Sequence, residues 1–204
     1  MNSSNQPGRK SESTGILKKN LENIGIQEIG IWKEMVLQDD ALFSEIYSLI
    51  YCDNPRIAWH AAWVTDHVSE ADPKKLEAYV PEMIDHLPNL TSSSLKRHFT
   101  RMFLSQKIPE SRLGKMVDTL YDLLSPSEAV AVRANALQLL HNIAMKLPEL
   151  QQELISVTES ILEEEVLTPG MKSKARKVLR SLRGSMREED PKEKYRCHSP
   201  QKNR

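Results

Sequence analysis

The 204-residue sequence has little glycine, little cysteine and few aromatic residues. Seven glycines, none in a phosphate-binding pattern, disfavour a nucleotide loop, and an aromatic content of 5% disfavours an all-β fold. The two cysteines, Cys52 and Cys197, lie far apart in the chain, a pattern that is not typical of a disulfide framework. Such sparse cysteine is typical of a reducing compartment, so we expect a cytoplasmic protein.

Net charge of one sign and long apolar runs are also missing. Lys and Arg number 28, and Asp and Glu number 28, so no global field attracts nucleic acid or an anionic membrane. No apolar run reaches the length of a membrane span, and the N-terminal residues are polar. We therefore expect no membrane partner, no transmembrane span and no signal peptide.

Motifs of catalysis and metal binding are absent too: G-x-S-x-G, G-x-G-x-x-G, a Walker loop, H-E-x-x-H and C-x-x-C. Asp66 and His67 are adjacent and point about 100° apart on a helix, so they form no dyad by spacing. His60 and His67 lie about 10 Å apart along a helix, too far to share one zinc ion. Cys197 and His198 have no further ligands nearby. We predict a non-enzymatic protein with no catalytic residues, cofactor or metal.

Residues 125–146 hold the clearest structural pattern. Ser125 can cap a helix, Pro126 suits its first position, and Glu128 follows three residues after the cap as in a capping box. Apolar residues then follow on one helical stripe: Val132, Ala136, Leu139, Leu140 and Ile143. The pattern predicts an amphipathic helix that begins near Pro126.

The same stripe recurs every 37 to 39 residues. Its first column is Ile57, Leu95, Val132 and Met171, and its second is Ala61, Phe99, Ala136 and Ala175. Each such helix follows a cap signal: Asn54-Pro55, Thr91-Ser92, Ser125-Pro126 and Thr168-Pro169. A preceding helix repeats as well, with one column at Leu76, Leu113 and Leu150 and another at Val80, Val117 and Leu154. Two helices per repeat of this length are typical of HEAT and armadillo solenoids.

The stretch LLSPSEAVAVRANALQLLHNIA, with its Val132-Arg133 pair and small Ala136, resembles the second helix of the HEAT-repeat family. The resemblance covers about residues 40–183 and implies an all-α fold, a right-handed α-α superhelix with a concave binding face. The chain is also similar to small bacterial HEAT-like proteins, some labelled adenylosuccinate lyase. The lyase family's serine loop, of the form S-S-x-M-P-x-K-x-N-P, has no counterpart at Ser92–Ser94.

The predicted organisation has three parts. Residues 1–25 are expected to be disordered, residues 26–183 to form the repeat domain, and residues 184–204 to form a disordered tail. The domain divides into four helical hairpins at about 40–70, 73–106, 109–146 and 148–183, preceded by a capping helix at about 27–38. Pro81 predicts a kink inside the second hairpin.

Candidate binding residues lie three, six and ten positions after the first-column residue of each second helix (Ile57, Leu95, Val132 and Met171), together with some neighbours, on the face opposite the core. In a HEAT-like solenoid this face lines the groove. The predicted set is Trp59, His60, Trp63, His67, Arg97, His98, Arg101, Asn135, Gln138, Lys174 and Lys177. Trp and Arg are frequent in binding hot spots. Trp59 could instead pack between adjacent repeats and Trp63 against the N-terminal cap, and the polar groups could be merely solvated.

Three functions remain open from the sequence. The first is a scaffold that binds a protein or peptide partner in the groove. The second is a nucleic-acid module, similar to HEAT-like DNA alkylation-repair proteins, in which Lys96, Arg97, Arg101, Lys174 and Lys177 contact phosphates. The third is the lyase activity of the label above.

The last hairpin carries opposite charges on its two helices: the first helix is acidic and the second is basic. The two polar faces could simply complement each other, or the basic face could bind phosphate or an acidic partner.

Overall fold

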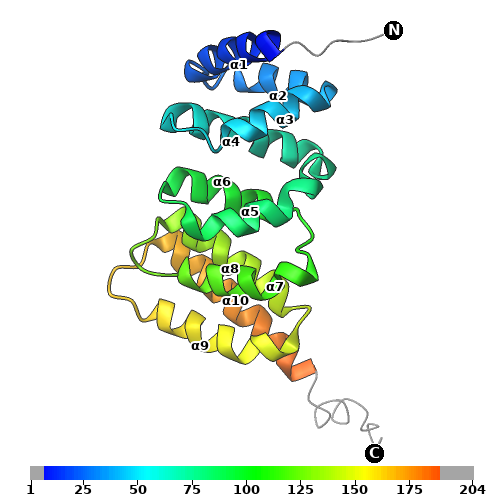
Figure 1. The fold of residues 1–204 in the computed structure, drawn as a ribbon. Helices are drawn as coiled ribbons and strands as arrows, with labels where there is room; N and C mark the ends of the chain where they lie inside the picture. Colours follow the sequence, from blue (N-terminus) through cyan, green and yellow to red (C-terminus); the bar gives the residue numbers. More distant parts are fainter. Residues whose placement is uncertain (1–6, 189–204) are drawn as a thin grey trace, which may run out of the picture. The chain divides into compact units, whose positions relative to one another are not determined.

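The computed structural model of the chain describes residues 7–188, and the side chains of residues 15–186. Over that range the chain forms ten α-helices, three short 3-10 helices and no strand (Figure 1). This is the all-α, HEAT-like architecture that the repeats predict. Residues up to Met116 form one compact unit and those from Val117 form a second, with the boundary inside α7 (Glu110–Asp122).

The N-terminal unit is arranged around α4, which contacts α1, α2, α3 and α6. Its elements are α1 (Pro7–Glu22), α2 (Ile29–Gln38), α3 (Asp40–Leu49), α4 (Pro55–Ala71), the 3-10 helix η1 (Pro73–Tyr79), α5 (Val80–His86), the 3-10 helix η2 (Leu87–Asn89) and α6 (Ser93–Phe103). The helix expected over 73–87 is interrupted, because Pro81 cannot supply an interior N–H and the α-helix begins anew at Val80.

Polar side chains fix where several of these helices begin. The carboxylate of Asp39 accepts from the backbone N–H of Ala41 at 2.9 Å, and Asn54 accepts from Arg56 N–H at 3.0 Å. Ser92 does the same for α6 through the N–H of Leu95 at 3.4 Å. These contacts satisfy backbone donors that the first helical turn leaves without partners.

The N-terminal segment differs from the prediction. Residues 1–25 were expected to be disordered, but α1 is helical and contacts α4, with Leu17 and Leu21 buried. The reason is a short stripe of apolar residues, Leu17, Leu21 and Ile24, four and three positions apart, which can be buried once α4 is present. The predicted disorder at residues 1–6 and 189–204, and the Cys197–His198 pair, lie outside the described residues.

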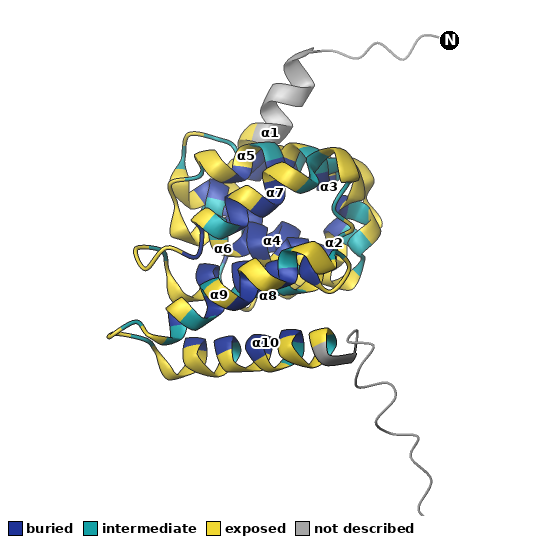
Figure 2. Ribbon diagram, turned by 90° about the horizontal axis from the view of Figure 1, so that it is seen from below, coloured by how far each residue is buried: buried dark blue, intermediate teal, exposed yellow. Residues whose placement is uncertain are grey.

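The C-terminal unit contains α8 (Val130–Ala144), the 3-10 helix η3 (Pro148–Leu150), α9 (Gln151–Leu162) and α10 (Pro169–Glu188). Helix α10 contacts both α8 and α9, and it continues past residue 183, where the repeat domain was expected to end. Figure 2 shows α10 buried along one side and exposed along the other. Thr168 caps α10, accepting from the N–H of Met171 at 3.3 Å.

The capping box predicted for α8 is wrong. The helix begins at Val130, four residues later than expected, and no side chain caps it. The Ser125 hydroxyl instead lies 2.8 Å from that of Ser127, and the N–H of Glu128 donates to the Ser125 carbonyl at 3.0 Å. Ser125 and Pro126 therefore form a turn before the helix, a use of Ser and Pro that local sequence cannot distinguish from a cap.

Most residues of the apolar columns lie in the core as predicted, whereas Leu95, Leu113 and Leu150 are half-buried. Ala61 and Phe99 in the N-terminal unit, and Ala136 and Ala175 in the C-terminal unit, are fully buried. The first-helix column that includes Val80 and Leu154 is buried as well. Because side chains on one stripe share one environment, this pattern could be read before any contact was known.

Candidate binding surfaces of the second helices

A stacked pair of tryptophans lies on α4. The rings of Trp59 and Trp63 are 5.9 Å apart and nearly parallel, at 6°, because residues four apart are neighbours on a helix surface. Both side chains are half-buried. The indole N–H of Trp63 donates to Nε2 of His67 at 3.0 Å, whereas the buried Nε1 of Trp59 has no partner among the described residues.

His60 was predicted on the exposed face, and this is wrong. The residue is 3% exposed, and its Nδ1–H donates to the backbone carbonyl of Leu21 at 2.6 Å. A carbonyl only accepts, so Nδ1 carries the proton. The prediction failed because α1, which was expected to be disordered, lies against this position of α4.

His98 was also predicted to be exposed and is buried, 3% exposed. Its Nδ1–H donates to Oδ2 of Asp66 at 2.7 Å, and Nε of Arg101 donates to Oδ1 of the same carboxylate at 2.9 Å. Asp66 is itself 2% exposed. The two donors lie on α6 and the acceptor on α4, so this cluster holds the two helices together.

Arg101 extends the cluster to the surface. Its Nη2 donates to Glu70 at 3.3 Å, and Glu70 lies 3.8 Å from Nδ1 of His67. Burial lowers the pKa of His67, and the Arg101 guanidinium lowers it further. A neutral His67 retains the Nε2 lone pair that accepts from Trp63. The predicted residues Trp63, His67, His98 and Arg101 are thus connected, through Asp66 and Glu70, which the prediction omitted. Arg97 is exposed on α6.

A polar ladder connects α8 and α10 in the C-terminal unit. Lys174 Nζ donates to Oε1 of Gln138 at 2.9 Å, and the Gln138 amide donates to Asn142 at 2.8 Å. His141 Nε2 lies 2.9 Å from the Ser181 hydroxyl, and burial lowers the pKa of His141. The structure therefore brings the predicted Gln138 and Lys174 into contact. Asn135 is half-exposed and Lys177 is exposed.

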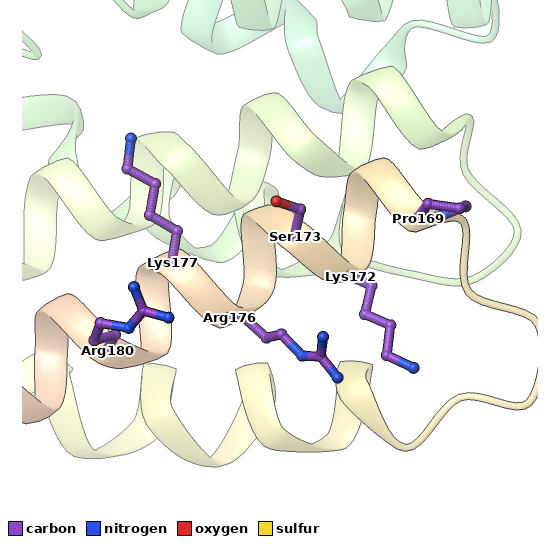
Figure 3. Close-up of a pocket in the computed structure, with 6 residues that line it drawn as sticks. All are labelled: Pro169, Lys172, Ser173, Arg176, Lys177 and Arg180. Carbon is purple, nitrogen blue, oxygen red and sulfur yellow. The ribbon is translucent and has the colours of Figure 1, made fainter.

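The exposed side of α10 carries a row of bases that we call the basic seam: Lys172, Arg176, Lys177 and Arg180. With Pro169 and Ser173 they line a shallow hollow of about 520 Å³ (Figure 3). None of the four makes an ion pair with another described residue. The sequence showed the basic charge of this helix, but the register of the candidate positions selected Lys174 and Lys177 and omitted Arg176 and Arg180.

Arg133 is a buried arginine, 4% exposed, at the start of α8. Its Nε donates to the Leu124 carbonyl at 2.9 Å, and its guanidinium forms a two-pronged pair with Glu164, with Nη1 to Oε2 at 2.9 Å. Glu164 lies in the segment between α9 and α10, so its pair with Arg133 holds the α9–α10 hairpin against α8. The sequence singled out Arg133 but not its partner.

The HEAT repeat domain family matches residues 16–182. The chain belongs to the HEAT-repeat family. The match begins within α1, which is consistent with the structural role of that helix and extends beyond the region of resemblance predicted from about residue 40. Neither a curated protein nor a solved structure gives a significant match.

HEAT-repeat proteins are typically non-catalytic scaffolds, and their repeats commonly mediate protein interactions. In this HEAT-repeat protein, no described helix is long and apolar enough to cross a membrane. No group of three His, Cys, Asp or Glu side chains among the residues described could hold a metal ion.

Proposed function

We propose that this HEAT-repeat protein is a non-enzymatic scaffold that binds a protein or peptide partner through the outward faces of its second helices, α4, α6, α8 and α10. The observation that carries the proposal is the half-exposed Trp59–Trp63 stack on α4. Tryptophan side chains are enriched among the residues that contribute most to protein–protein binding.

The tryptophan stack is ordered before any partner arrives. Ring stacking and the hydrogen bond from Trp63 to His67 restrict the rotamers of both residues. A surface fixed in this way loses less conformational entropy on binding than a mobile one. Polar groups beside it, such as His67 and Glu70, can form the rim that surrounds an aromatic anchor.

The buried polar groups have a different role in this proposal. His60, Asp66 and His98 are almost fully buried and bonded within the N-terminal unit, so they position α4 and α6 rather than touch a partner. Arg101 is engaged by Asp66 and Glu70, which leaves it poorly suited to bind phosphate. The binding residues proposed here are Trp59, Trp63, His67, Arg97, Asn135, Gln138, Lys174 and Lys177.

The test is affinity capture from the native host, with the full chain as bait and Trp63→Ala as the variant. We expect a stoichiometric partner with the wild-type protein and about thirtyfold weaker association with the variant, as for a hot-spot residue. Trp32→Ala is the matched control, because Trp32 is also half-buried but lies on α2. A wild-type bait that retains no partner, or a partner retained equally by Trp63→Ala, contradicts the proposal.

A further inference from the structure

Helix α10 has two opposite faces. One is apolar, with Met171, Ala175, Val178 and Leu182 buried in the C-terminal unit. The other carries Pro169, Lys172, Ser173, Arg176 and Arg180, at spacings of three, one, three and four residues. This is the spacing with which helices present a continuous stripe to a neighbouring helix, but here the stripe is basic instead of apolar.

The positive charges of the basic seam repel one another. Lys172, Arg176 and Arg180 follow at intervals of four residues, so they cover about 12 Å of one helix face. Like charges at this spacing weaken a helix. No acidic residue in the described part of the chain pairs with these three, so the described residues do not relieve the repulsion. An acidic partner would relieve it.

We propose that the basic seam docks an acidic helical segment of a partner protein; this inference rests on the scaffold function proposed above and names the chemistry of one of its partners. Glutamates four residues apart on a helix lie about 6 Å apart, which matches the spacing of the seam. The small side chain of Ser173 leaves a hollow between the long bases, and a second one of about 450 Å³ lies beside Gly184.

The C-terminal unit already contains one contact of this kind. Glu159 on α9 pairs with Arg183 on α10, so a glutamate from a helix packed alongside reaches a base of α10. The proposed segment would repeat that contact with Lys172, Arg176 and Arg180, which are exposed and line the hollow on α10.

An acidic helix fits this surface better than a nucleic acid does. No aromatic residue occurs in α10, so the seam offers no platform on which bases could stack. The neighbouring α9 exposes Glu153, and Glu163 follows it. These carboxylates would repel a phosphate backbone that extends beyond one helix width, whereas a single helix can lie along the seam alone.

The experiment measures binding of labelled peptides to the full chain by fluorescence anisotropy at about 20 mM and about 150 mM salt. The probe is an amphipathic peptide of about twenty residues with glutamate at every fourth position. A peptide of the same composition in scrambled order, a single-stranded DNA and a duplex DNA are compared with it. The test variant is Lys172→Gln/Arg176→Gln/Arg180→Gln. The control is Lys74→Gln/Lys107→Gln/Lys146→Gln, which removes the same charge from exposed positions elsewhere.

We expect the helical peptide to bind the wild-type chain, and binding to weaken about tenfold for the test variant and for the scrambled peptide. The control triple variant should stay within about twofold of wild type. The inference is overturned if the helical peptide does not bind at low salt, if both triple variants weaken it equally, or if either DNA binds more tightly. Far-ultraviolet circular dichroism checks folding, and the single variant Arg176→Gln gives a smaller loss in the same direction.

Running both triple variants in the affinity capture separates this inference from the proposed function. Loss of the captured partner with the seam variant alone, together with an acidic helical segment at the mapped contact, supports the inference. A partner retained at wild-type level by the seam variant refutes it and leaves the scaffold function intact. If even the wild-type bait captures nothing, the scaffold function itself has failed.

Discussion

His98 on α6 donates its Nδ1–H to the carboxylate of Asp66 on α4, across 2.7 Å and in a setting where both residues are at most 3% exposed. Arg101 satisfies the other oxygen of that carboxylate at 2.9 Å. A buried carboxylate is stable only when hydrogen-bonding partners replace the water it has lost. The contact between α4 and α6 therefore depends on a polar cluster as well as on apolar packing.

Arg101→Glu should act as a destabilising substitution, although the arginine side chain is 44% exposed. It removes a donor from buried Asp66 and places a new negative charge beside Asp66 and Glu70. We expect the free energy of unfolding to fall by about 2–4 kcal/mol, measured by urea denaturation. Lys74→Glu, at an exposed position of η1, should change it by less than about 0.5 kcal/mol. Equal small effects of the two substitutions would contradict the role assigned to Arg101.

His67 should confer a pH dependence on the Trp63 hydrogen bond. Burial lowers the pKa of His67 in the folded state, and Arg101 lowers it further against the opposing effects of Asp66 and Glu70. The unfolded chain therefore binds the proton more readily. The stabilisation of the fold by neutral His67 is fully present above the ordinary histidine pKa. It is lost as the pH falls through the lower pKa that His67 has in the folded state.

The measurement is the indole N–H resonance of Trp63 between about pH 7.5 and pH 5.5, together with urea unfolding at both ends. Protonated His67 cannot accept at Nε2, so the resonance should shift and stability should fall as pH falls. In His67→Gln, which does not titrate, the Trp63 resonance should respond less to pH and the loss of stability should be smaller. A Trp63 resonance that is constant in the wild-type protein would contradict a hydrogen bond that protonation of His67 breaks in this pH range.

Arg133→Ala should be among the most damaging substitutions in the C-terminal unit. It leaves the Leu124 carbonyl and the Glu164 carboxylate without their buried donor. We expect a loss of about 2–3 kcal/mol by urea denaturation, and only partial recovery in Arg133→Lys, because lysine cannot form the two-pronged pair. Arg183→Ala removes a pair whose side chains are 55% and 42% exposed, and should cost about 0–1 kcal/mol. The reverse order of these losses would be incompatible with the buried pair described above.

The repeated helices could be predicted from sequence because burial is periodic along a helix. Ala61, Phe99, Ala136 and Ala175 share one column and are all fully buried. The start of α8 could not be predicted in the same way. Ser125 and Pro126 favour a cap and a turn equally, and only the hydrogen bond from Glu128 N–H to the Ser125 carbonyl distinguishes them.

The candidate site was predicted less well because a histidine's environment depends on other elements. His60 occupies an outward position on α4, and it is α1 that makes it part of the interior. His98 is buried beside Asp66, a residue 32 positions earlier in the chain. Periodicity reports which face of a helix is apolar, but it does not report which distant carboxylate or carbonyl meets a polar residue on the opposite face.

Leu21→Ala should test whether α1 is an integral part of the N-terminal unit. Leu21 is fully buried, and its carbonyl accepts from His60, so the substitution leaves a cavity where α1 contacts α4. We expect a loss of about 2–4 kcal/mol in urea denaturation and faster hydrogen exchange in α1. Ile16→Ala is the control, because Ile16 lies on the same helix but is 63% exposed, and its loss should stay below about 0.5 kcal/mol. Equal effects of the two substitutions would mean that α1 does not contribute its buried stripe to the core, and that the disorder predicted for this segment was correct.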